Sequence, residues 1–345
     1  MLPCPDLDAA LAFFTEQLGF RLETIMPADQ PTVAVVSGHD LVLRLERHGA
    51  GWPGRLRLGS DDLLGRHGGA VVAPNGTIVE LVATDPPMIV PPLAARFELT
   101  PAAHREAGGV GRAAMHYRDL LPSRQGGRFI ASHITIPAGG PVPDYVHHHR
   151  IRFQVIYCRR GWVRVVYEDQ GEPFVLEAGD CVLQPSGIRH RVLESSAGLE
   201  VIEVTSPAEH PTHVDHDLAL PTAAVRPDRS FDGQTFVRHR SRDAARGPWR
   251  SPGFEARDCG IAAATGGLGD VRVARATVAG AATAWGHHDA ELLLWFVVSG
   301  TATLRLDGRP DAGLGAEDAV AIPAGLDHAL TDCSDDLEIL EVTVA

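Results

Sequence analysis

The spacing of hydrophobic residues changes along the chain and divides it into an α+β part and a longer all-β part. Between Asp6 and Gly19, four apolar residues recur at the spacing of a helix with one buried face: Leu7, Leu11, Phe14 and Leu18. Asp6 is suited to cap this helix and Gly19 to end it. Short β-type runs follow at residues 32–36, 41–45, 55–58 and 77–82. We therefore predict a small α+β module over residues 1–95.

After a Pro-rich stretch at residues 85–92, the pattern becomes that of a β-sandwich or barrel from about residue 127. Short apolar runs separated by turn-forming residues lie at 128–136, 153–158, 162–167, 174–176, 181–184 and 189–193. A connector rich in Pro and Arg spans roughly 207–252, after which the β pattern resumes with Asp307-Gly308 as a hairpin signal. The sequence thus predicts a mainly β protein.

The two β regions repeat each other. Four pairs of residues match at a nearly constant separation along the chain: Gly161 with Gly300, Pro185 with Pro323, Gly187 with Gly325, and His190 with His328. A register held over this length with one net deletion indicates an internal duplication. We predict two β domains, over residues 110–225 and 226–345.

The first repeat contains four candidate metal ligands. Two histidines that are two positions apart point to the same face of a strand. A turn brings position 154 back to that face, and the Pro185-x-Gly187 turn delivers a third imidazole from another strand. The predicted ligands are His147, His149, Gln154 and His190, with His148 directed outward. A neutral amide binds metal weakly, so Gln154 is either a fourth ligand or a hydrogen-bond donor beside the metal. Three imidazoles and one oxygen donor suit a divalent first-row metal and leave positions open for substrate.

This spacing resembles the cupin superfamily, whose motifs are G-x5-H-x-H-x3-4-E-x6-G and G-x5-P-x-G-x2-H-x3-N. The second motif fits from Gly179 to His190, and the first fits from His147 to Gly161. The chain departs from the family in having Gln154 for the usual glutamate, Gly140 one position further from His147, and no asparagine after Leu193 and Glu194. The resemblance implies a bicupin, with two double-stranded β-helix (jelly-roll) barrels over about residues 115–345.

In the second repeat the first-motif positions hold Gly286, His288 and Leu293. His288 and His328 are a candidate second site, but two imidazoles without a third donor bind metal poorly. His287 or Glu291 could complete the set; a structural or substrate-shaping domain is the favoured interpretation. A further trio, His210, His213 and His216, lies beside Pro211 and acidic residues, which favours a solvated loop.

The strings PDLDAALAFFTEQLGFRLE and GGAVVAPNGTIVELV resemble the vicinal-oxygen-chelate family of glyoxalases and bleomycin-resistance proteins, over roughly residues 1–83. In that family a strand carrying the first metal ligand precedes the helix, whereas this chain has only Met1 to Pro5 there. The second half of the module is also short, with little room for the helix that the family has in that half. Glu80 stands where a carboxylate ligand would lie, without its partners. We therefore expect a degenerate module kept for packing.

Composition narrows the range of partners. A net charge of -13 argues against nucleic acid and anionic membrane surfaces. The chain has no lysine, so all 31 basic residues are arginines, which excludes Schiff-base and Walker-type lysine chemistry. The five cysteines form no C-x-x-C pair and no apolar run is long enough to span a membrane, so we expect reduced thiols and a cytoplasmic protein. Oligomeric state stays open: the repeats pair within one chain, or the protein forms a homodimer.

Three neutral imidazoles and a neutral amide would leave a bound metal with its full charge in a low-dielectric interior. Such a centre favours a small anionic substrate, such as a hydroxy acid, a keto acid or a hydroxybenzoate, and leaves positions for O₂. Cupins with three-histidine Fe(II) centres include ring-cleaving and thiol dioxygenases, so the resemblance implies a metal-dependent dioxygenase and favours Fe(II). The ligands themselves also suit Mn, Ni or Zn. Two alternatives stay open: a non-redox isomerase or lyase with a Lewis-acid metal, and a metabolite-binding bicupin without turnover.

Other residues are candidates for handling the substrate. His133, in the strand before the metal ligands, is the predicted acid or base. Tyr117, Arg118 and Arg152 are candidates for anchoring an anionic substrate.

Overall fold

The computed structural model describes residues 1–103, 111 and 115–345. The chain is mainly β and divides into two compact units, Met1–Met88 and Ile89–Ala345. None of the helices in the described part reaches the length and apolarity needed to cross a membrane.

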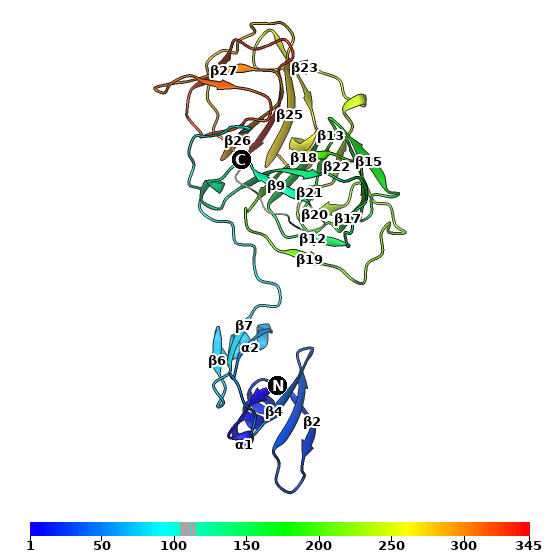
Figure 1. Ribbon diagram of the computed structural model, residues 1–345, viewed down its shortest axis with the longest axis vertical. Coiled ribbons are helices and arrows are strands. Elements are labelled where there is room, and N and C mark those ends of the chain that lie inside the picture. Colours follow the sequence, from blue (N-terminus) through cyan, green and yellow to red (C-terminus); the bar gives the residue numbers. More distant parts are fainter. Residues whose placement is uncertain (104–110, 112–114) are drawn as a thin grey trace. The chain divides into compact units, whose positions relative to one another are not determined.

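The first unit is α+β (Figure 1). Asp6 caps helix α1 (Leu7–Ala12) by accepting a hydrogen bond from the Ala9 amide at 3.0 Å, and a π-helical turn, η1 (Phe13–Gln17), continues it. One sheet has the order β1-β4-β3-β2 and the other β5-β7-β6. The strands are β1 (Leu2–Pro3), β2 (Arg21–Met26), β3 (Val33–Gly38), β4 (Leu41–Glu46), β5 (Arg55–Gly59), β6 (Ala70–Val72) and β7 (Ile78–Val82).

The second half of this unit does hold a helix, contrary to the expectation that it has little room for one. Helix α2 (Asp61–His67) begins at Ser60, whose hydroxyl accepts a hydrogen bond from the Leu63 amide. Its first turn is acidic and its last turn basic, which suits the helix dipole. The helix is short enough to fit between β5 and β6, so the connection is compact but helical.

The first part of the second unit is a sandwich of two sheets, here called the first sandwich (Figure 1). Its large sheet has the order β22-β16-β13-β18-β10-β9, formed by β9 (His116–Asp119), β10 (Ile130–Ile136), β13 (Phe153–Arg160), β16 (Cys181–Leu183), β18 (Leu199–Ser206) and β22 (Val237–His239). Its small sheet has the order β15-β14-β17-β12-β19, formed by β12 (His147–His149), β14 (Trp162–Tyr167), β15 (Phe174–Glu177), β17 (His190–Ser195) and β19 (Thr212–Val214), with β11 (Gly140–Pro141) paired to β17. Apolar residues from both sheets fill the space between them.

The second sandwich has the same plan. Its large sheet runs β23-β24-β25-β31-β26-β29-β8 and its small sheet β28-β27-β30. These strands are β8 (Glu98–Thr100), β23 (Gly247–Pro248), β24 (Phe254–Asp258), β25 (Gly269–Ala276), β26 (Leu292–Ser299), β27 (Ala302–Leu306), β28 (Ala312–Leu314), β29 (Ala319–Ile322), β30 (His328–Thr331) and β31 (Glu338–Val344). A short helix, α3 (Ile261–Ala264), precedes β25, and a small hairpin, β20 (Ser230–Phe231) and β21 (Gln234–Thr235), lies in the connector.

The pairing register supports the duplication seen in the sequence. In the first sandwich Val155 pairs with Val204, and in the second Leu294 pairs with Val342, at the positions that the repeat relates to each other. Two strands belong to a different sandwich from the one that their position in the chain would suggest. β22 falls within the predicted second domain yet joins the first sandwich, whereas β8 precedes the first sandwich yet joins the second.

The two large sheets share one hydrophobic core. Phe153, Val155 and Tyr157 of β13 lie in the same buried cluster as Leu292, Leu294 and Phe296 of β26. Since alternate residues of a strand point to opposite faces, each large sheet packs one face on its own small sheet and the other on the neighbouring sandwich. The two repeats thus pair within one chain.

Gly269 tests how tightly this shared core is packed. A Cβ at Gly269 of β25 would overlap the ring of Phe153, which is fully buried, whereas Gly247 of β23 has open space around it. We expect Gly269→Ala to lower the free energy of unfolding by about 1–3 kcal/mol, because the aromatic ring has no room to move aside. The control, Gly247→Ala, should change it by less than about 0.5 kcal/mol. Chemical denaturation followed by circular dichroism measures both; equal stabilities would contradict close packing of the two sandwiches.

Candidate metal centre

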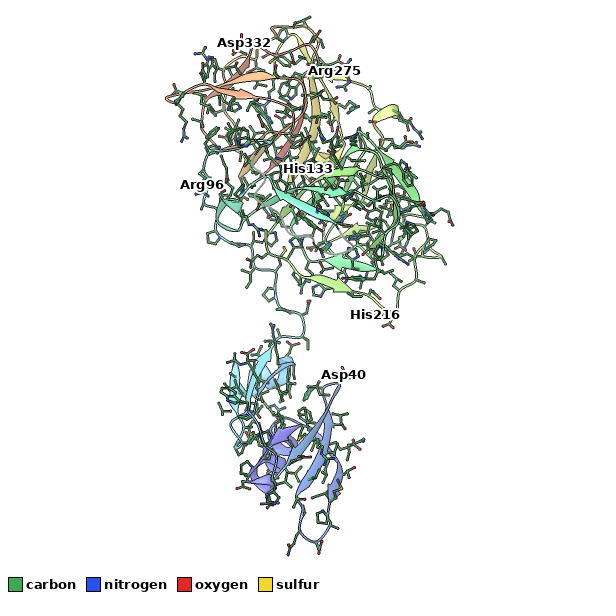
Figure 2. The ribbon with its side chains drawn as sticks, in the orientation of Figure 1. Asp40, Arg96, His133, His216, Arg275 and Asp332 are labelled. Atoms are coloured by element: carbon green, nitrogen blue, oxygen red, sulfur yellow. The ribbon has the colours of Figure 1, made fainter. Side chains whose placement is uncertain are left out.

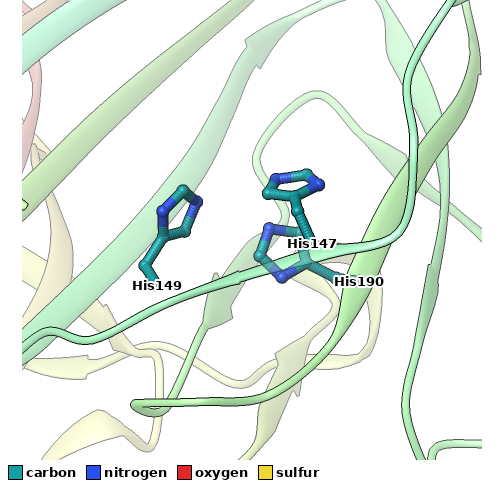
Figure 3. A group of neighbouring side chains, drawn as sticks. All are labelled: His147, His149 and His190. Carbon is teal, nitrogen blue, oxygen red and sulfur yellow. The ribbon is translucent and has the colours of Figure 1, made fainter. Parts of the chain in front are cut away.

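Three histidines meet inside the first sandwich. β12 presents His147 and His149 on its inner face, and β17 presents His190, which pairs directly with His147. All three side chains are buried. One nitrogen atom of each lies within 4.8 Å of the others, and the rings turn toward a common space (Figure 3). The centroids of the His147 and His190 rings are 4.2 Å apart.

Hydrogen bonds at Nδ1 fix the tautomer of two of these three imidazoles. His147 Nδ1 lies 2.8 Å from the carbonyl oxygen of Tyr145, and His190 Nδ1 lies 3.1 Å from that of Ile188. A carbonyl oxygen only accepts, so Nδ1 carries the proton and Nε2 keeps its lone pair. His149 Nδ1 lies 3.4 Å from the Thr212 hydroxyl, which permits the same tautomer. Metal-binding histidines are typically held in this way, so the donor set fits a divalent first-row metal.

Gln154 lies in a chain of buried hydrogen bonds. The Tyr167 hydroxyl donates to Gln184 Oε1 at 2.6 Å, and Gln184 Nε2 donates to Gln154 Oε1 at 3.0 Å. Gln154 Nε2 in turn donates to the Glu203 carboxylate. Burial raises the pKa of Tyr167, which keeps its hydroxyl protonated as the first donor. Both ends of the Gln154 amide therefore have partners, while its role as a metal ligand stays a prediction.

The histidines line a cavity of about 90 Å³. Apart from the histidines, Gln154, Gln184, Tyr117, Tyr167 and Glu203, its walls are apolar: Met115, Ile134, Ile136, Ile156, Val163, Val165, Leu176, Val192, Leu199 and Val201. Among the described lining residues Glu203 is the one carboxylate. It is not among the predicted site residues, because the local pattern does not predict β18 as a strand. The sequence feature that could have revealed Glu203 is the alternation of Leu199, Val201 and Glu203, which places a charged residue on the inward face of β18.

His133, the predicted acid or base, does not line this cavity. Ile134 and Ile136 of β10 face the cavity, so strand alternation turns His133 to the opposite face. There its ring lies 5.9 Å from the ring of Phe296 in the second sandwich, and its Nε2 lies 3.1 Å from a Glu200 carboxylate oxygen. Figure 2 shows His133 where the two sandwiches adjoin. Burial lowers its pKa.

The two predicted anchoring arginines also bridge the sandwiches. Arg118 donates to the Glu317 carbonyl oxygen at 3.0 Å, and Arg152 pairs with Glu291 at 2.8 Å. Tyr117, by contrast, does line the cavity. No arginine among the described residues lines it, so an anionic substrate there would meet the imidazoles or a metal that they hold.

The segment of His210, His213 and His216 is not wholly a loop. Residues 212–214 form β19, which pairs with β12 so that His213 lies opposite His148. His148 points outward, as predicted, and its ring stacks on that of His213 at 5.1 Å. Pro211 precedes the strand, a position that needs no ladder amide, so proline does not prevent pairing. Burial, followed by the charge of Arg189, lowers the pKa of His148.

The other candidate metal positions have different partners. The rings of His288 and His328 are 6.3 Å apart, and His288 Nε2 donates to the Ile322 carbonyl oxygen at 2.9 Å. His287 and Glu291, the possible third donors, form ion pairs elsewhere. His287 pairs with Asp327, and Glu291 pairs with Arg128 and Arg152. Glu80 pairs with Arg55 at 2.6 Å. Within the described residues, only the group of His147, His149 and His190 brings three ligating side chains together.

Comparison with known proteins identifies the fold around this centre. Residues 132–205 match the family model of the cupin domain. This stretch contains all three histidines of the group, and no curated protein matches the sequence. Protein Ylba from E. coli superposes with a TM-score of 0.54 at 13% identity, covering 73% of this chain and 92% of that protein. Oxalate decarboxylase from Bacillus subtilis, described with Mn(II) centres, superposes with a TM-score of 0.53 at 14% identity, covering 76% of this chain and 80% of that enzyme. The same enzyme at pH 4.6 gives 0.52, at 14% identity and with 74% and 77% covered. At these identities the likeness shows the cupin fold alone.

Metal content tests the group directly. Protein purified without an affinity tag should contain one divalent ion per chain, and His147→Ala and His190→Ala should both lose it because each removes an imidazole donor. His148→Ala is the matched control, since it removes a neighbouring histidine that points away from the group. Elemental analysis measures the metal, and circular dichroism checks that each variant is folded. Full metal content in folded His147→Ala and His190→Ala would refute the site.

Proposed function

We propose that this protein is a bicupin metalloenzyme in which His147, His149 and His190 hold a divalent metal. Its substrate is a small organic acid with an apolar body. The observation that carries the proposal is the meeting of three buried imidazoles at a cavity, two of them fixed by backbone carbonyls in the tautomer that binds metal. In this proposal each sandwich is a cupin barrel, and the α+β unit is a degenerate vicinal-oxygen-chelate module.

We propose dioxygenation with Fe(II) as the reaction. A bound Fe(II) would supply Lewis-acid polarisation of the substrate and one-electron chemistry with O₂. Both atoms of O₂ enter the product of a dioxygenase, so the reaction needs no external reductant. The metal set has three neutral imidazoles, which leaves coordination positions for substrate.

The walls of the cavity favour a substrate with an apolar part. Aliphatic side chains exclude water from one side of the substrate, and the lower dielectric there strengthens the electrostatic interactions on the other side. A dianion as small as oxalate has no apolar surface to bury against these walls. An aromatic or branched acid fits better, with its carboxylate directed toward the metal group and its body among Ile134, Val165 and Val201.

Glu203 takes the role of acid and base in this proposal, in place of His133. It is the carboxylate of the cavity, and the amide of Gln154 donates to one of its oxygens. The second oxygen is then the atom that takes a proton from the substrate or returns one. The chain from Tyr167 through Gln184 and Gln154 orients this carboxylate, so Gln154 acts here as a positioning residue rather than as a fourth ligand.

A lyase or isomerase reaction is the second candidate. It is favoured by the fold likeness to oxalate decarboxylase, which is described with Mn(II) centres. In that case Mn(II) would polarise a carboxylate or carbonyl, and Glu203 would move the proton. Consumption of O₂ separates the two candidates, because the second needs none in stoichiometric amounts.

Turnover of a panel of aromatic and branched carboxylic acids tests the reaction. Apo protein loaded with Fe(II) should consume one O₂ per product with at least one of these acids, as measured with an oxygen electrode. Product formed anaerobically by the Mn(II) form would instead establish the lyase or isomerase. Binding without turnover of any acid, with either metal, would overturn both and leave a binding protein.

Glu203→Gln tests the proton transfer separately from metal binding. We expect the variant to keep its metal and to lose about 10²-fold or more in kcat, since the amide cannot accept a proton. Glu194→Gln is the control, because Glu194 lies on β17 with a side chain that is 39% exposed. Full activity in metal-loaded Glu203→Gln would contradict the assigned role.

A further inference from the structure

The second sandwich has a cavity of about 200 Å³ at the place that matches the metal group of the first. In the first sandwich His147 pairs with His190; in the second, Gly286 bridges to His328 in the same antiparallel manner. Gly286 thus replaces an imidazole with open space. The cavity is lined by Arg250, Ser251, Thr283, Trp285, Trp295 and His328.

Substitutions between the repeats remove two of the predicted metal donors and add a tryptophan to the cavity wall. In the register of the duplication, Leu293 stands for Gln154, and Trp295 stands for Ile156. Trp295 is 1% exposed to solvent and lines the cavity, while Trp285 is half exposed on the same lining. Two indoles on one small cavity suit a flat ring, which gains both apolar burial and stacking.

A buried carboxylate holds one of these two indoles, that of Trp295, in place. Glu341, which occupies the position of Glu203 in the second repeat, accepts hydrogen bonds from Trp295 Nε1 at 2.8 Å and Trp249 Nε1 at 3.3 Å. It also accepts from Arg250 at 2.5 Å. The Arg250 guanidinium lies 5.7 Å from the Trp295 ring and 5.2 Å from the Trp249 ring. The network therefore fixes both the indole and the cation before any ligand arrives.

The backbone of Arg250 is strained, with a φ of 23°. Such a conformation is costly for a residue with a β-carbon, and it persists only where surrounding contacts impose it. Here those contacts are the ion pair with Glu341 and the two indole rings. The same contacts that impose this backbone conformation hold the Arg250 guanidinium at the cavity.

Hydrogen-bond donors outnumber acceptors around the cavity. The Thr283 and Ser251 hydroxyl oxygens already accept from the backbone amides of Leu330 and Ala284, which leaves their protons to donate. Arg250 uses one of its terminal nitrogens for Glu341. His328 supplies an acceptor, because its Nδ1 lies 2.9 Å from the Leu326 carbonyl oxygen and burial lowers its pKa.

We infer that this cavity is a metal-independent binding site for small aromatic carboxylates. The rings of Trp285 and Trp295 would contact the aromatic ring, and Arg250 with the Ser251 and Thr283 hydroxyls would bind the carboxylate. A single negative charge is preferred over a dianion, since Glu341 already neutralises much of the guanidinium charge. A hydroxyl on the ligand ring would find its acceptor in His328.

Calorimetric titration of metal-stripped full-length protein with benzoate tests this inference. We expect binding in the millimolar range, as befits so small a ligand. Trp285→Ala should weaken it about 5-fold through loss of one stacking contact, and Arg250→Gln by more than about 10-fold through loss of the charged donors. Benzyl alcohol, which has the ring without the carboxylate, should bind at least about 10-fold more weakly than benzoate.

Two controls make the outcome decisive. Trp52→Ala removes a tryptophan that is 89% exposed in the other unit, and should leave benzoate binding unchanged. His147→Ala should also bind benzoate normally, which separates this site from the metal group of the proposed function. Arg250→Gln leaves Glu341 with fewer hydrogen-bond donors, so a melting curve of this variant checks that it is folded. If Arg250→Gln is unfolded, the test rests on Trp285→Ala, which changes a half-exposed side chain. No binding by the metal-stripped protein, or equal affinity in folded Trp285→Ala and the unaltered chain, would overturn the inference.

Discussion

Each side chain on a β-strand must point to one face of its sheet, and this alternation decides whether a polar residue of the first large sheet lies in the cavity or against the second sandwich. On β10, β13 and β18, one set of residues faces the cavity and the other faces the second sandwich. Gln154 and Glu203 fall in the first set, and His133 and Glu200 in the second. Residues that line the cavity and residues that contact the second sandwich therefore lie on the same strands, and a shift of one position in register would exchange the two sets.

Duplication has given two pockets at matching positions but with different chemistry. The first has three imidazoles, two amides and a carboxylate, whereas the second has glycine, leucine and tryptophan where the first has His147, Gln154 and Ile156. The carboxylate is common to both, at Glu203 and Glu341. In the first pocket it faces a polar chain; in the second it orders two indoles and a guanidinium. A glutamate at the same repeat position thus contacts two different sets of neighbours.

Local spacing in the sequence is enough to predict the three histidines and most strands of the first sandwich, because strand period and turn residues act over a few positions. The run at residues 162–167 has the same bounds as β14. The same patterns miss β18 and β19, and with them Glu203 and the neighbours of His148. The placement of His133, Arg118 and Arg152 depends on packing between the two repeats, across a long separation in the chain that local patterns do not contain.

The strands exchanged at the edges of the large sheets affect how this chain can be divided. β8 precedes the first sandwich yet completes the second, and β22 lies beyond the predicted boundary yet completes the first. A cut between the repeats would strip an edge strand from each and uncover the apolar sheet faces that now meet. The two sandwiches therefore form one folding unit, because neither repeat has a complete large sheet or a covered core without the other.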